Sequence, residues 1–367
     1  MNTKFYLMWK DIPVIYFNTA ESEASILNST HKPFSICGSG NIYSSLHKYL
    51  SDRIILFNRI YCKEILDVCG LDAQDPLSIC LVSRALSFTD FYWIKGKDET
   101  ISFSDVNLRH NVFNNVIEYT ALTGRVKQIV VSDKLFTGQL TTKGTRPKCF
   151  SREENRIYMY KAETSTEIDS EILSYLIARL LNIRASQYQY ARKYDRECSK
   201  CEISNPEVEL VSAREILSHF GETSFGLESN TMKCFLQFEE TFKMFIFDYL
   251  TLNTDRNRDN FGLASKDSRV IGLYPLFDHD SCFKGLSENA IYFPINKPLS
   301  KIPDILVRYN KMDIVRDSVL NAAPSFKSDK FREIFLRFQS ALNYDNMMER
   351  MDKLIQVAGL DKTSLFD

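Results

Sequence analysis

Three polar residues in the second half of the chain have types and spacing suited to phosphoryl transfer. Asp255 and Asn260 lie five residues apart in DRNRDN, and Asp278 follows in YPLFD. An Asp can accept the proton of an attacking hydroxyl, whereas an Asn and a second Asp offer the oxygen ligands that Mg²⁺ prefers. An Asp–Asn pair at this spacing is expected about once by chance in such a chain. Taken singly, the same residues are equally typical of turns and strand ends.

The surrounding pattern strengthens the hypothesis because it predicts elements that bring the three residues together. A long aromatic helix is expected to end just before Asp255, with apolar residues at helical spacing: Phe235, Phe238, Phe242, Phe245, Ile246 and Tyr249. The following FGLA, the polar SKDS and RVIGL are typical of two strands joined by a turn. Such a hairpin returns Asp278 to the neighbourhood of Asn260.

A lysine within a strand is the next candidate. NRIYMYKA alternates, so Lys161 shares a face with apolar side chains. Thr164 and Glu167 have capping-box spacing at the start of the next helix, and Glu171 within that helix is a candidate partner for Lys161. A strand lysine held by a helix glutamate and reaching the α- and β-phosphates is the protein-kinase arrangement. A solvent-facing lysine on an edge strand is the alternative.

The loop FTGQLTTKGTRPK precedes the lysine strand, where a phosphate-covering loop is expected. Its turn at Gly144, its backbone amides and the hydroxyls of Thr141, Thr142 and Thr145 can meet phosphate oxygens. The loop matches neither G-x-G-x-x-G nor a Walker sequence, so the prediction depends on the strand beside it.

Bulk properties restrict the class of protein. With 367 residues, 44% of them hydrophobic, the chain is long enough for two lobes. A net charge of −1 and the lack of a basic run argue against generic nucleic-acid binding. The sequence has no run of about 18 uncharged apolar residues, and its nine cysteines are an odd number that fits reduced thiols. We expect a soluble cytoplasmic protein without direct membrane or nucleic-acid binding.

The order of elements predicts an α+β fold. The first hundred residues combine strand-like PVIYF and RIILF with a helix near YSSLHKYLSDR, and residues 90–122 are expected to pack across them. The strand VKQIVV, the lysine strand, SQYQYARKY and ECSKCEIS come next, and helices dominate the remainder, ending with KFREIFLRFQSAL and NMMERMDKLIQVAG. We predict an N-terminal α+β subdomain (1–125), a β-rich lobe (126–208) and a mainly helical lobe (209–367).

Read in order, these segments resemble the HipA-like serine/threonine kinases, a bacterial family related in architecture to phosphoinositide kinases. TTKGTRPKCF resembles the loop of that family, IYMYKA its ATP-lysine strand and EILSYLIARLLNI the following helix. LNTDRNRDNFGL is similar to its catalytic loop, and LYPLFDHDSCF to its metal-binding segment. The resemblance covers most of the chain and is most specific over 137–283. Asn257 stands where many relatives have His, which puts the catalytic rate in question.

The resemblance implies a two-lobed protein-kinase-like fold, with a β-rich N-lobe and a mainly α-helical C-lobe, that uses ATP and Mg²⁺. It implies Lys161 as the ATP lysine with Glu171 as its partner, Asp255 as the catalytic base, and Asn260 and Asp278 as metal ligands. The hinge that meets adenine would be Glu209, Leu210 and Val211. Self-phosphorylation at Thr141, Thr142 or Thr145 is a further hypothesis, because some relatives phosphorylate a serine in this loop.

Three functions remain compatible with the sequence. The first is a toxin-like or signalling kinase that phosphorylates Ser or Thr of a protein substrate. The second is a lipid or small-molecule kinase, against which the lack of a basic, apolar membrane-binding stretch argues. The third is a pseudokinase that serves as a binding module with an antitoxin or regulatory partner. The presence of all four core residues argues against the third.

Overall fold

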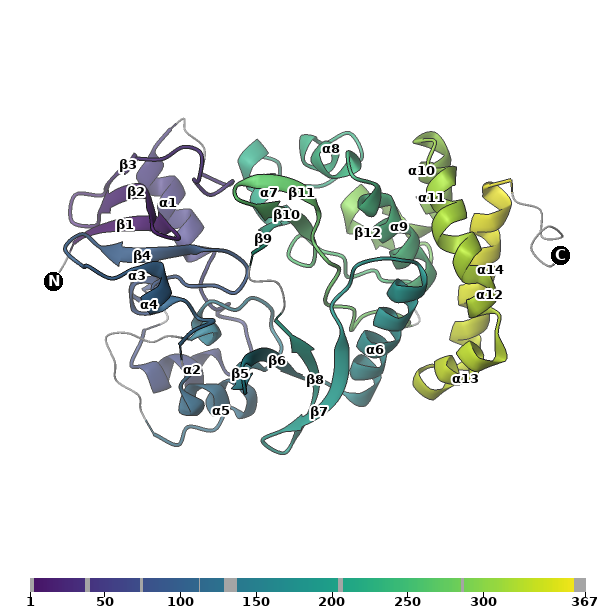
Figure 1. Cartoon of the computed structure of the whole chain (residues 1–367), viewed down its shortest axis with the longest axis horizontal. Helices are drawn as coiled ribbons and strands as arrows, with labels where there is room; N and C mark the ends of the chain where they lie inside the picture. Colours follow the sequence, from purple (N-terminus) through teal and green to yellow (C-terminus); the bar gives the residue numbers. More distant parts are fainter. Residues whose placement is uncertain are drawn as a thin grey trace. The chain divides into compact units, whose positions relative to one another are not determined.

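The computed structural model describes residues 3–36, 40–72, 75–111, 113–128, 137–203, 207–284 and 287–359. The chain is a mixed α+β protein with several antiparallel sheets, and it forms two compact units (Figure 1). Unit 1 comprises Met1–Glu163, Tyr190–Leu210 and Ser265–Arg269, whereas unit 2 comprises Thr164–Gln189, Val211–Ala264 and Val270–Asp367. The division at residues 125 and 208 stays a prediction. Over the described residues, every helix is too short or too polar to span a membrane.

The first sheet of unit 1 has the strand order β3-β2-β1-β4. In it, β1 pairs antiparallel with both β2 and β4, so the segment 90–122 does pack across the amino-terminal strands as expected. One core cluster joins this sheet to the helices of the first 125 residues and also includes Cys149 and Tyr160 of the second sheet. The elements are β1 (Lys4–Trp9), β2 (Ile12–Asn18), β3 (Glu23–Ile26), α1 (Ile42–Ser51), α2 (Cys62–Cys69), α3 (Pro76–Val82), β4 (Tyr92–Gly96), α4 (Phe103–Val106) and α5 (Asn115–Thr123).

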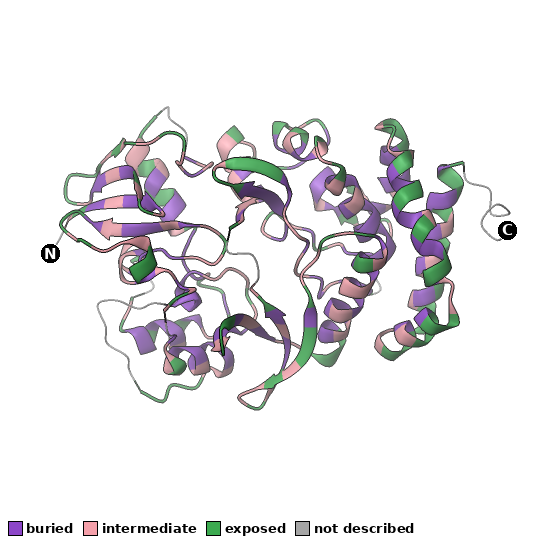
Figure 2. Cartoon of the chain, viewed as in Figure 1, coloured by how far each residue is buried: buried purple, intermediate pink, exposed green. Residues whose placement is uncertain are grey.

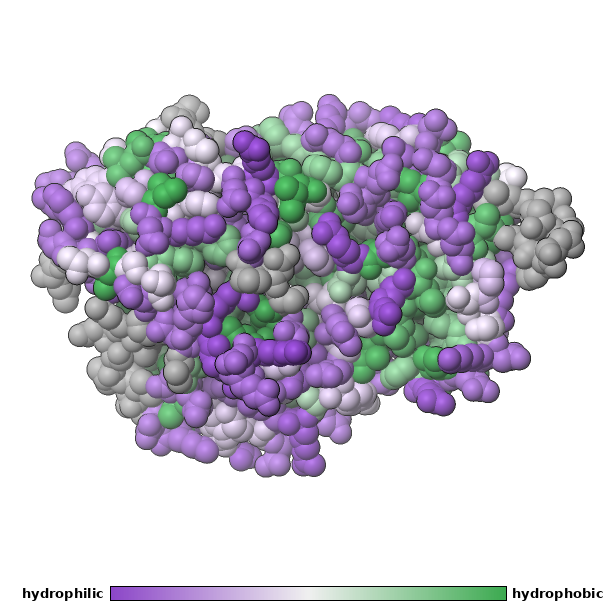
Figure 3. Space-filling view, in the orientation of Figure 1, coloured by the Kyte–Doolittle hydropathy of each residue, from purple (hydrophilic) through white to green (hydrophobic). Residues whose placement is uncertain are grey.

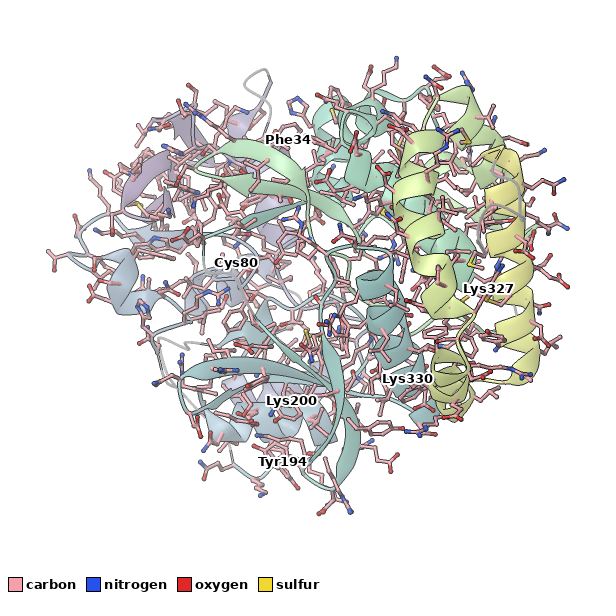
Figure 4. The ribbon with its side chains drawn as sticks, turned by 45° about the vertical axis from the view of Figure 1, so that its right-hand side comes forward. Phe34, Cys80, Tyr194, Lys200, Lys327 and Lys330 are labelled. Carbon is pink, nitrogen blue, oxygen red and sulfur yellow. The ribbon has the colours of Figure 1, made fainter. Side chains whose placement is uncertain are left out.

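The second sheet carries the lysine strand and has the order β5-β6-β8-β7. Strand β6 lies between β5 and β8, so Lys161 is on an interior strand and the edge-strand alternative is wrong. At the β7–β8 end, Lys200 lies over the Tyr158 ring at 3.9 Å, and the Tyr194 hydroxyl donates to Glu118; Figure 4 labels Lys200 and Tyr194. The elements are η1 (Gly138–Leu140), β5 (Lys148–Glu153), β6 (Arg156–Ala162), β7 (Tyr188–Lys193) and β8 (Arg196–Glu202).

Unit 2 is mainly helical. Its first helix begins with the predicted capping box, in which Thr164 N donates to Glu167 Oε2 at 3.0 Å. Helix α9 is buried over most of its length, whereas α13 and α14 each carry buried and exposed residues (Figure 2). The helices are α6 (Ser165–Leu180), α7 (Ala213–Phe220), α8 (Asn230–Leu236), α9 (Glu239–Thr251), α10 (Ile302–Arg308), α11 (Met312–Val315), α12 (Asn321–Phe326), α13 (Asp329–Phe338) and α14 (Ala341–Val357), with the short η2 (Phe293–Ile295), η3 (Leu299–Lys301) and η4 (Arg316–Leu320).

The hairpin after the catalytic loop forms as expected. Its turn residues Asp267 and Ser268 both have positive φ, 47° and 63°, which is the backbone of a two-residue turn that matches strand twist. Strands β9 (Glu209–Ser212), β10 (Gly262–Lys266) and β11 (Arg269–Leu273) form a sheet in the order β11-β10-β9, and β12 (Ile291–Tyr292) pairs with β13 (Lys297–Pro298).

Two expectations about regular structure were wrong. RIILF is not a strand, because residues 52–60 form turns and irregular backbone between α1 and α2, with Ile54 and Ile55 buried. The single long aromatic helix is two helices, since Phe238 adopts an extended conformation (φ −108°, ψ 132°) as the cap of α9. The strand expected at VKQIVV lies partly outside the described residues. On the face shown in Figure 3, polar and apolar residues are interspersed.

Candidate active site

A buried ion pair organises the polar loop after α9. Asp248 lies in the aromatic helix α9, and its carboxylate receives Arg256 Nε at 3.1 Å and Nη2 at 2.9 Å. Asn253 Nδ2 donates to the same carboxylate at 3.0 Å, and the Tyr292 hydroxyl also donates to it. The four side chains are almost completely buried. An ion pair in such a place requires this many donors, because taking both charges out of water is costly.

Arg256 then connects two segments that are distant in sequence. Its Nη1 donates to the carbonyl of Asn260 at 2.9 Å and to the carbonyl of Phe277 at 3.0 Å. Phe277 directly precedes Asp278. The guanidinium therefore holds the Asn260 segment and the Asp278 segment within reach of one another, as the sequence pattern predicted.

Asp255 and Asn260 are in direct contact. Asn260 Nδ2 donates to the Asp255 carbonyl at 2.9 Å and lies 3.4 Å from the carboxylate Oδ2. On the other side, Asn257 Nδ2 donates to Asp255 Oδ1 at 3.1 Å, while Asn257 Oδ1 accepts from the Asp259 amide at 2.9 Å. Asn257 thus orients the candidate base.

Asp278 has an uncommon backbone conformation for a residue with a side chain. Its φ is +60°, in the left-handed region, and its amide donates to the Tyr188 hydroxyl at 3.2 Å. The next amide, that of His279, donates to Glu171 Oε2 at 2.7 Å, so the buried Glu171 of α6 fixes this segment. Left-handed residues that the surroundings hold in place are concentrated at functional sites.

The carboxylates of this cluster influence one another. Although Asp255 is exposed as a residue, partial burial of its carboxyl raises its pKa; the Asn257 amide lowers that pKa, and the negative charges of Asp278 and Asp280 raise it again. Asp280 is itself buried. A carboxyl whose pKa is raised toward neutrality is better suited to accept a proton than an ordinary Asp.

The donor set fits a hard divalent cation. Asn260, with its Nδ2 engaged by Asp255, keeps a carboxamide oxygen for a ligand, and Asp278 supplies a carboxylate. Mg²⁺ takes only one or two protein carboxylates and fills its remaining positions with water and phosphate oxygens. The described residues contain no group of three or more His, Cys, Asp or Glu side chains arranged to hold a metal. Asn260 and Asp278 offer the oxygen ligands that such a cation takes from a protein.

In unit 1, Lys161 is buried on the central strand β6. Its Nζ lies 2.7 Å from Glu163 Oε1, and the other oxygen of Glu163 accepts from the Ser199 hydroxyl. Glu163 was not among the residues that the sequence suggested, although it lies two positions after the lysine, just beyond the end of β6. Because Lys161 belongs to unit 1 and Glu171 to unit 2, their pairing stays a prediction.

The three threonines of the loop before the lysine strand differ in hydrogen bonding and in exposure. The buried Thr141 donates from its hydroxyl to the Leu86 carbonyl at 2.6 Å, and the Thr142 hydroxyl donates to the Gly138 carbonyl. Thr145, in contrast, is exposed. The hydroxyls of Thr141 and Thr142 are therefore engaged within the loop, and Thr145 is the accessible one of the three.

The backbone conformation of Gly144 favours glycine. Its φ is +89°, and a Cβ at this position would lie 2.5 Å from Lys148 Nζ. Lys148 is buried and pairs directly with Lys161 across β5 and β6. The turn at Gly144 thus passes against a lysine ammonium beside the candidate ATP lysine.

The expected hinge has one unexpected feature. The buried Glu209 directs its carboxylate to Trp9 Nε1 at 3.0 Å and to the Phe91 amide at 3.3 Å. Leu210 N donates to the Thr89 carbonyl at 2.7 Å. The Glu209 side chain is therefore engaged by β1 and by the residue that precedes β4. Val211 lies at the start of the next stretch of unit 2.

The predicted residues fall into two groups. Unit 2 brings Asp255 and Asn260 into contact and ties both to the Asp278 segment, with Glu171 behind it. Unit 1 holds Lys161, the loop, Glu209 and Leu210. That the two groups bind one nucleotide stays a prediction. Asp248, Asp280 and Glu163 were missed; a lone Asp within an aromatic helix was the available signal for Asp248.

Comparison with known proteins identifies the fold. No protein-family model matches the sequence, and no curated protein sequence is significantly similar to it. HipA of the Shewanella oneidensis MR-1 toxin–antitoxin system, solved with HipB and its operator DNA, matches with a TM-score of 0.52 and 12% identity over 96% of each chain. The Helicobacter pylori proinflammatory kinase CtkA matches with a TM-score of 0.38 and 19% identity over 59% of this chain and 91% of that chain. The match to HipA shows that this chain has a HipA-like fold, which confirms the expected resemblance.

Proposed function

We propose that this protein is an ATP- and Mg²⁺-dependent kinase that transfers the γ-phosphate of ATP to a Ser or Thr hydroxyl of a protein. One observation carries the proposal. Arg256 donates to the carbonyls of Asn260 and Phe277, and Asn260 in turn contacts Asp255, so the candidate base and both candidate metal ligands lie in one cluster. A base and two oxygen ligands are the minimum that this reaction requires of the protein. The HipA-like fold supports the same function.

In this proposal Asp255 accepts the proton of the attacking hydroxyl while the new O–P bond forms and the bond to the β-phosphate oxygen breaks, releasing ADP. Asn257 holds the Asp255 carboxylate in one orientation through its amide. Asn260 and Asp278 would hold Mg²⁺, which when bound offsets charge on the phosphates.

Unit 1 supplies the groups proposed to bind the rest of the nucleotide. Lys161 and the loop 137–148 bind the phosphates, and the backbone of Glu209, Leu210 and Val211 meets adenine. The Glu209 side chain has no part in this contact because it is directed to Trp9.

The proposed partners are a protein acceptor and a regulatory protein. HipA of Shewanella oneidensis was solved with HipB, and by analogy we propose an antitoxin-like protein as the regulator. Self-phosphorylation is assigned to Thr145, because it is the exposed threonine of the loop.

One observation favours a second function, that of a pseudokinase used as a binding module. Lys161 is held at 2.7 Å by the fully buried Glu163, so a phosphate must compete with an internal carboxylate for the ammonium. If the carboxylate prevails, the protein retains the fold and its partners without phosphoryl transfer.

Transfer of labelled phosphate from ATP with Mg²⁺, to the protein itself and to a generic protein acceptor, tests the proposal. We expect transfer by the wild type, loss of transfer in Asp255→Ala and Asp278→Ala, and normal transfer in Asp304→Ala, a surface carboxylate of α10. ATP binding without transfer, in the presence of a panel of protein acceptors, would favour the pseudokinase. Absence of ATP binding in the wild type would contradict the nucleotide roles of Lys161, Asn260 and Asp278.

A further inference from the structure

The irregular segment between α1 and α2 runs alongside the loop 137–148. Two of its backbone amides donate to loop carbonyls: Ile55 N to Leu140 O at 2.7 Å, and Ile60 N to Thr145 O at 2.9 Å. These residues come from the amino-terminal 125 residues, for which the sequence suggested no role at the site. They make a backbone contact with the loop at each end of its turn.

Arg59 reinforces this contact from within the core. Its guanidinium is buried and donates through Nη1 to Gln139 O at 3.4 Å and through Nη2 to Lys148 O at 2.5 Å. Both acceptors are main-chain carbonyls of the loop and of the strand that follows it. Burial lowers the pKa of Arg59 to about 10, so the side chain is still charged at neutral pH.

Burying the Arg59 guanidinium costs desolvation free energy. Within the described part of the chain, Arg59 Nε is buried without a hydrogen-bond partner, and a buried charge held only by carbonyls contributes little net stability. An apolar side chain of similar volume would fill the same space without desolvating a charge. What the guanidinium provides and an apolar group cannot is a fork that holds Gln139 O and Lys148 O in fixed positions.

Because residues 55–60 bind carbonyls of the loop, they also restrict the direction of the loop amides. Because the peptide unit is planar and trans, the carbonyl of one residue and the amide of the next point in opposite directions. Fixing Thr145 O toward Ile60 therefore directs the Arg146 amide away from the amino-terminal segment. Backbone amides that face outward from a turn are the groups that bind phosphate oxygens.

We infer that residues 55–60, Arg59 among them, position the loop 137–148 for nucleotide phosphates before nucleotide binds. The inference rests on the proposed kinase function for the nature of the ligand. In it Arg59 is a positioning residue that acts through the loop backbone. On this inference, the amino-terminal region holds the phosphate loop in one conformation.

Limited trypsin digestion of the full-length protein tests the inference. Arg59→Met removes the fork and keeps the volume, whereas Arg59→Lys keeps the charge but not the two-pronged geometry. The matched control is Arg84→Met, since Arg84 is an equally buried arginine of unit 1 whose bonds go to Glu99 and Ile94. Mass spectrometry follows the fragment that ends at Lys143, and circular dichroism establishes that each variant is folded.

Loss of two charge-assisted hydrogen bonds should raise cleavage after Lys143 about tenfold or more in Arg59→Met, with a smaller rise in Arg59→Lys. Cleavage in Arg84→Met should equal that of the wild type. The KM for ATP should rise in the same order, most in Arg59→Met, less in Arg59→Lys and not in Arg84→Met, whereas kcat should change less. An unchanged cleavage rate in folded Arg59→Met, or an equal rise in Arg84→Met, would overturn the inference.

Two further outcomes are decisive. If Arg59→Met does not fold, Arg59→Lys decides, and wild-type cleavage in that variant would refute the positioning role. If the wild type transfers no phosphate, the proposed function fails, but the cleavage rates still show whether Arg59 holds the loop.

Discussion

Arg256 and Asp248 form a fully buried bidentate ion pair, with Nε–Oδ2 and Nη2–Oδ1 separations of 3.1 and 2.9 Å. The pair explains why an acidic residue lies within the aromatic helix α9. Its carboxylate neutralises the guanidinium that reaches the Asn260 and Phe277 carbonyls. The helix therefore anchors the candidate catalytic loop through charge as well as through packing.

Removing one partner of this ion pair should strongly destabilise the protein. Asp248→Ala leaves the Arg256 charge buried without its carboxylate, so we expect the free energy of unfolding to fall by about 3–5 kcal/mol. Urea denaturation measures the change. Glu228→Ala, which breaks an exposed pair with Arg308 at 2.6 Å, is the control and should cost less than about 1 kcal/mol. Equal losses in the two variants would contradict the anchoring role of Asp248.

Asn257 is expected to act on the rate and not on nucleotide affinity. Asn257→Ala removes the amide that orients Asp255 Oδ1 at 3.1 Å, so kcat should fall about tenfold while the KM for ATP changes less than about twofold. Steady-state kinetics separates the two parameters. Asn257→His, which restores a side chain able to donate, should recover part of the rate, and a rate below that of Asn257→Ala would count against this role.

The charge of Asp280 should set the pH at which the base becomes active. Asp255 must be ionised to accept a proton, and its raised pKa places the acid limb of the rate profile above that of an ordinary Asp. Asp280→Asn removes one of the charges that raise this pKa, so the limb of kcat/KM should move to lower pH.

The control for this shift is Asp259→Asn. Asp259 lies in the same loop, but Arg214 holds its carboxylate, with Nε at 2.5 Å from Oδ1. The acid limb should stay in place in that variant. A limb that moves equally in both variants, or in neither, would show that Asp280 does not act on Asp255.

Local patterns in the sequence were sufficient to predict β6, the capping box of α6 and the hairpin of β10 and β11. Each depends on residues close together in the chain: strict alternation, Thr164 with Glu167, and a polar turn between apolar runs. The return of the Asp278 segment to Asn260, which Arg256 joins through the Asn260 and Phe277 carbonyls, followed from the hairpin pattern. These are elements whose conformation is decided by their own residues.

Features decided by distant partners could not be predicted. RIILF has the composition of a strand, but Ile55 donates its amide to Leu140 of the loop and the segment stays irregular. The role of Asp248 depends on Arg256, eight residues away across a helix end. The break at Phe238 was signalled by Glu239 and Glu240, acidic residues typical of a first helical turn, which the aromatic pattern obscured.

Glu209 should make stability depend on pH in the sense opposite to a salt-bridged acid. Burial first, and then the negative charge of Asp90, raise its pKa from 4.5 to about 7, while hydrogen bonds from Trp9 and Phe91 and the charge of Lys10 oppose the rise. The folded state therefore binds more protons than the unfolded state between these values. Its stability must fall as pH rises through that window.

Glu209→Gln keeps an acceptor oxygen for the Trp9 indole and carries no charge. Between pH 4.5 and 7 its stability should increase relative to the wild type, by at most about 3 kcal/mol, as measured by urea denaturation at several pH values. Glu207→Gln is the control, because Lys266 lowers the pKa of the exposed Glu207 and its loss should act weakly in the opposite direction. Parallel stability curves for Glu209→Gln and the wild type would mean that the buried carboxyl does not titrate in this range, and that its contacts with Trp9 and Phe91 hold it ionised.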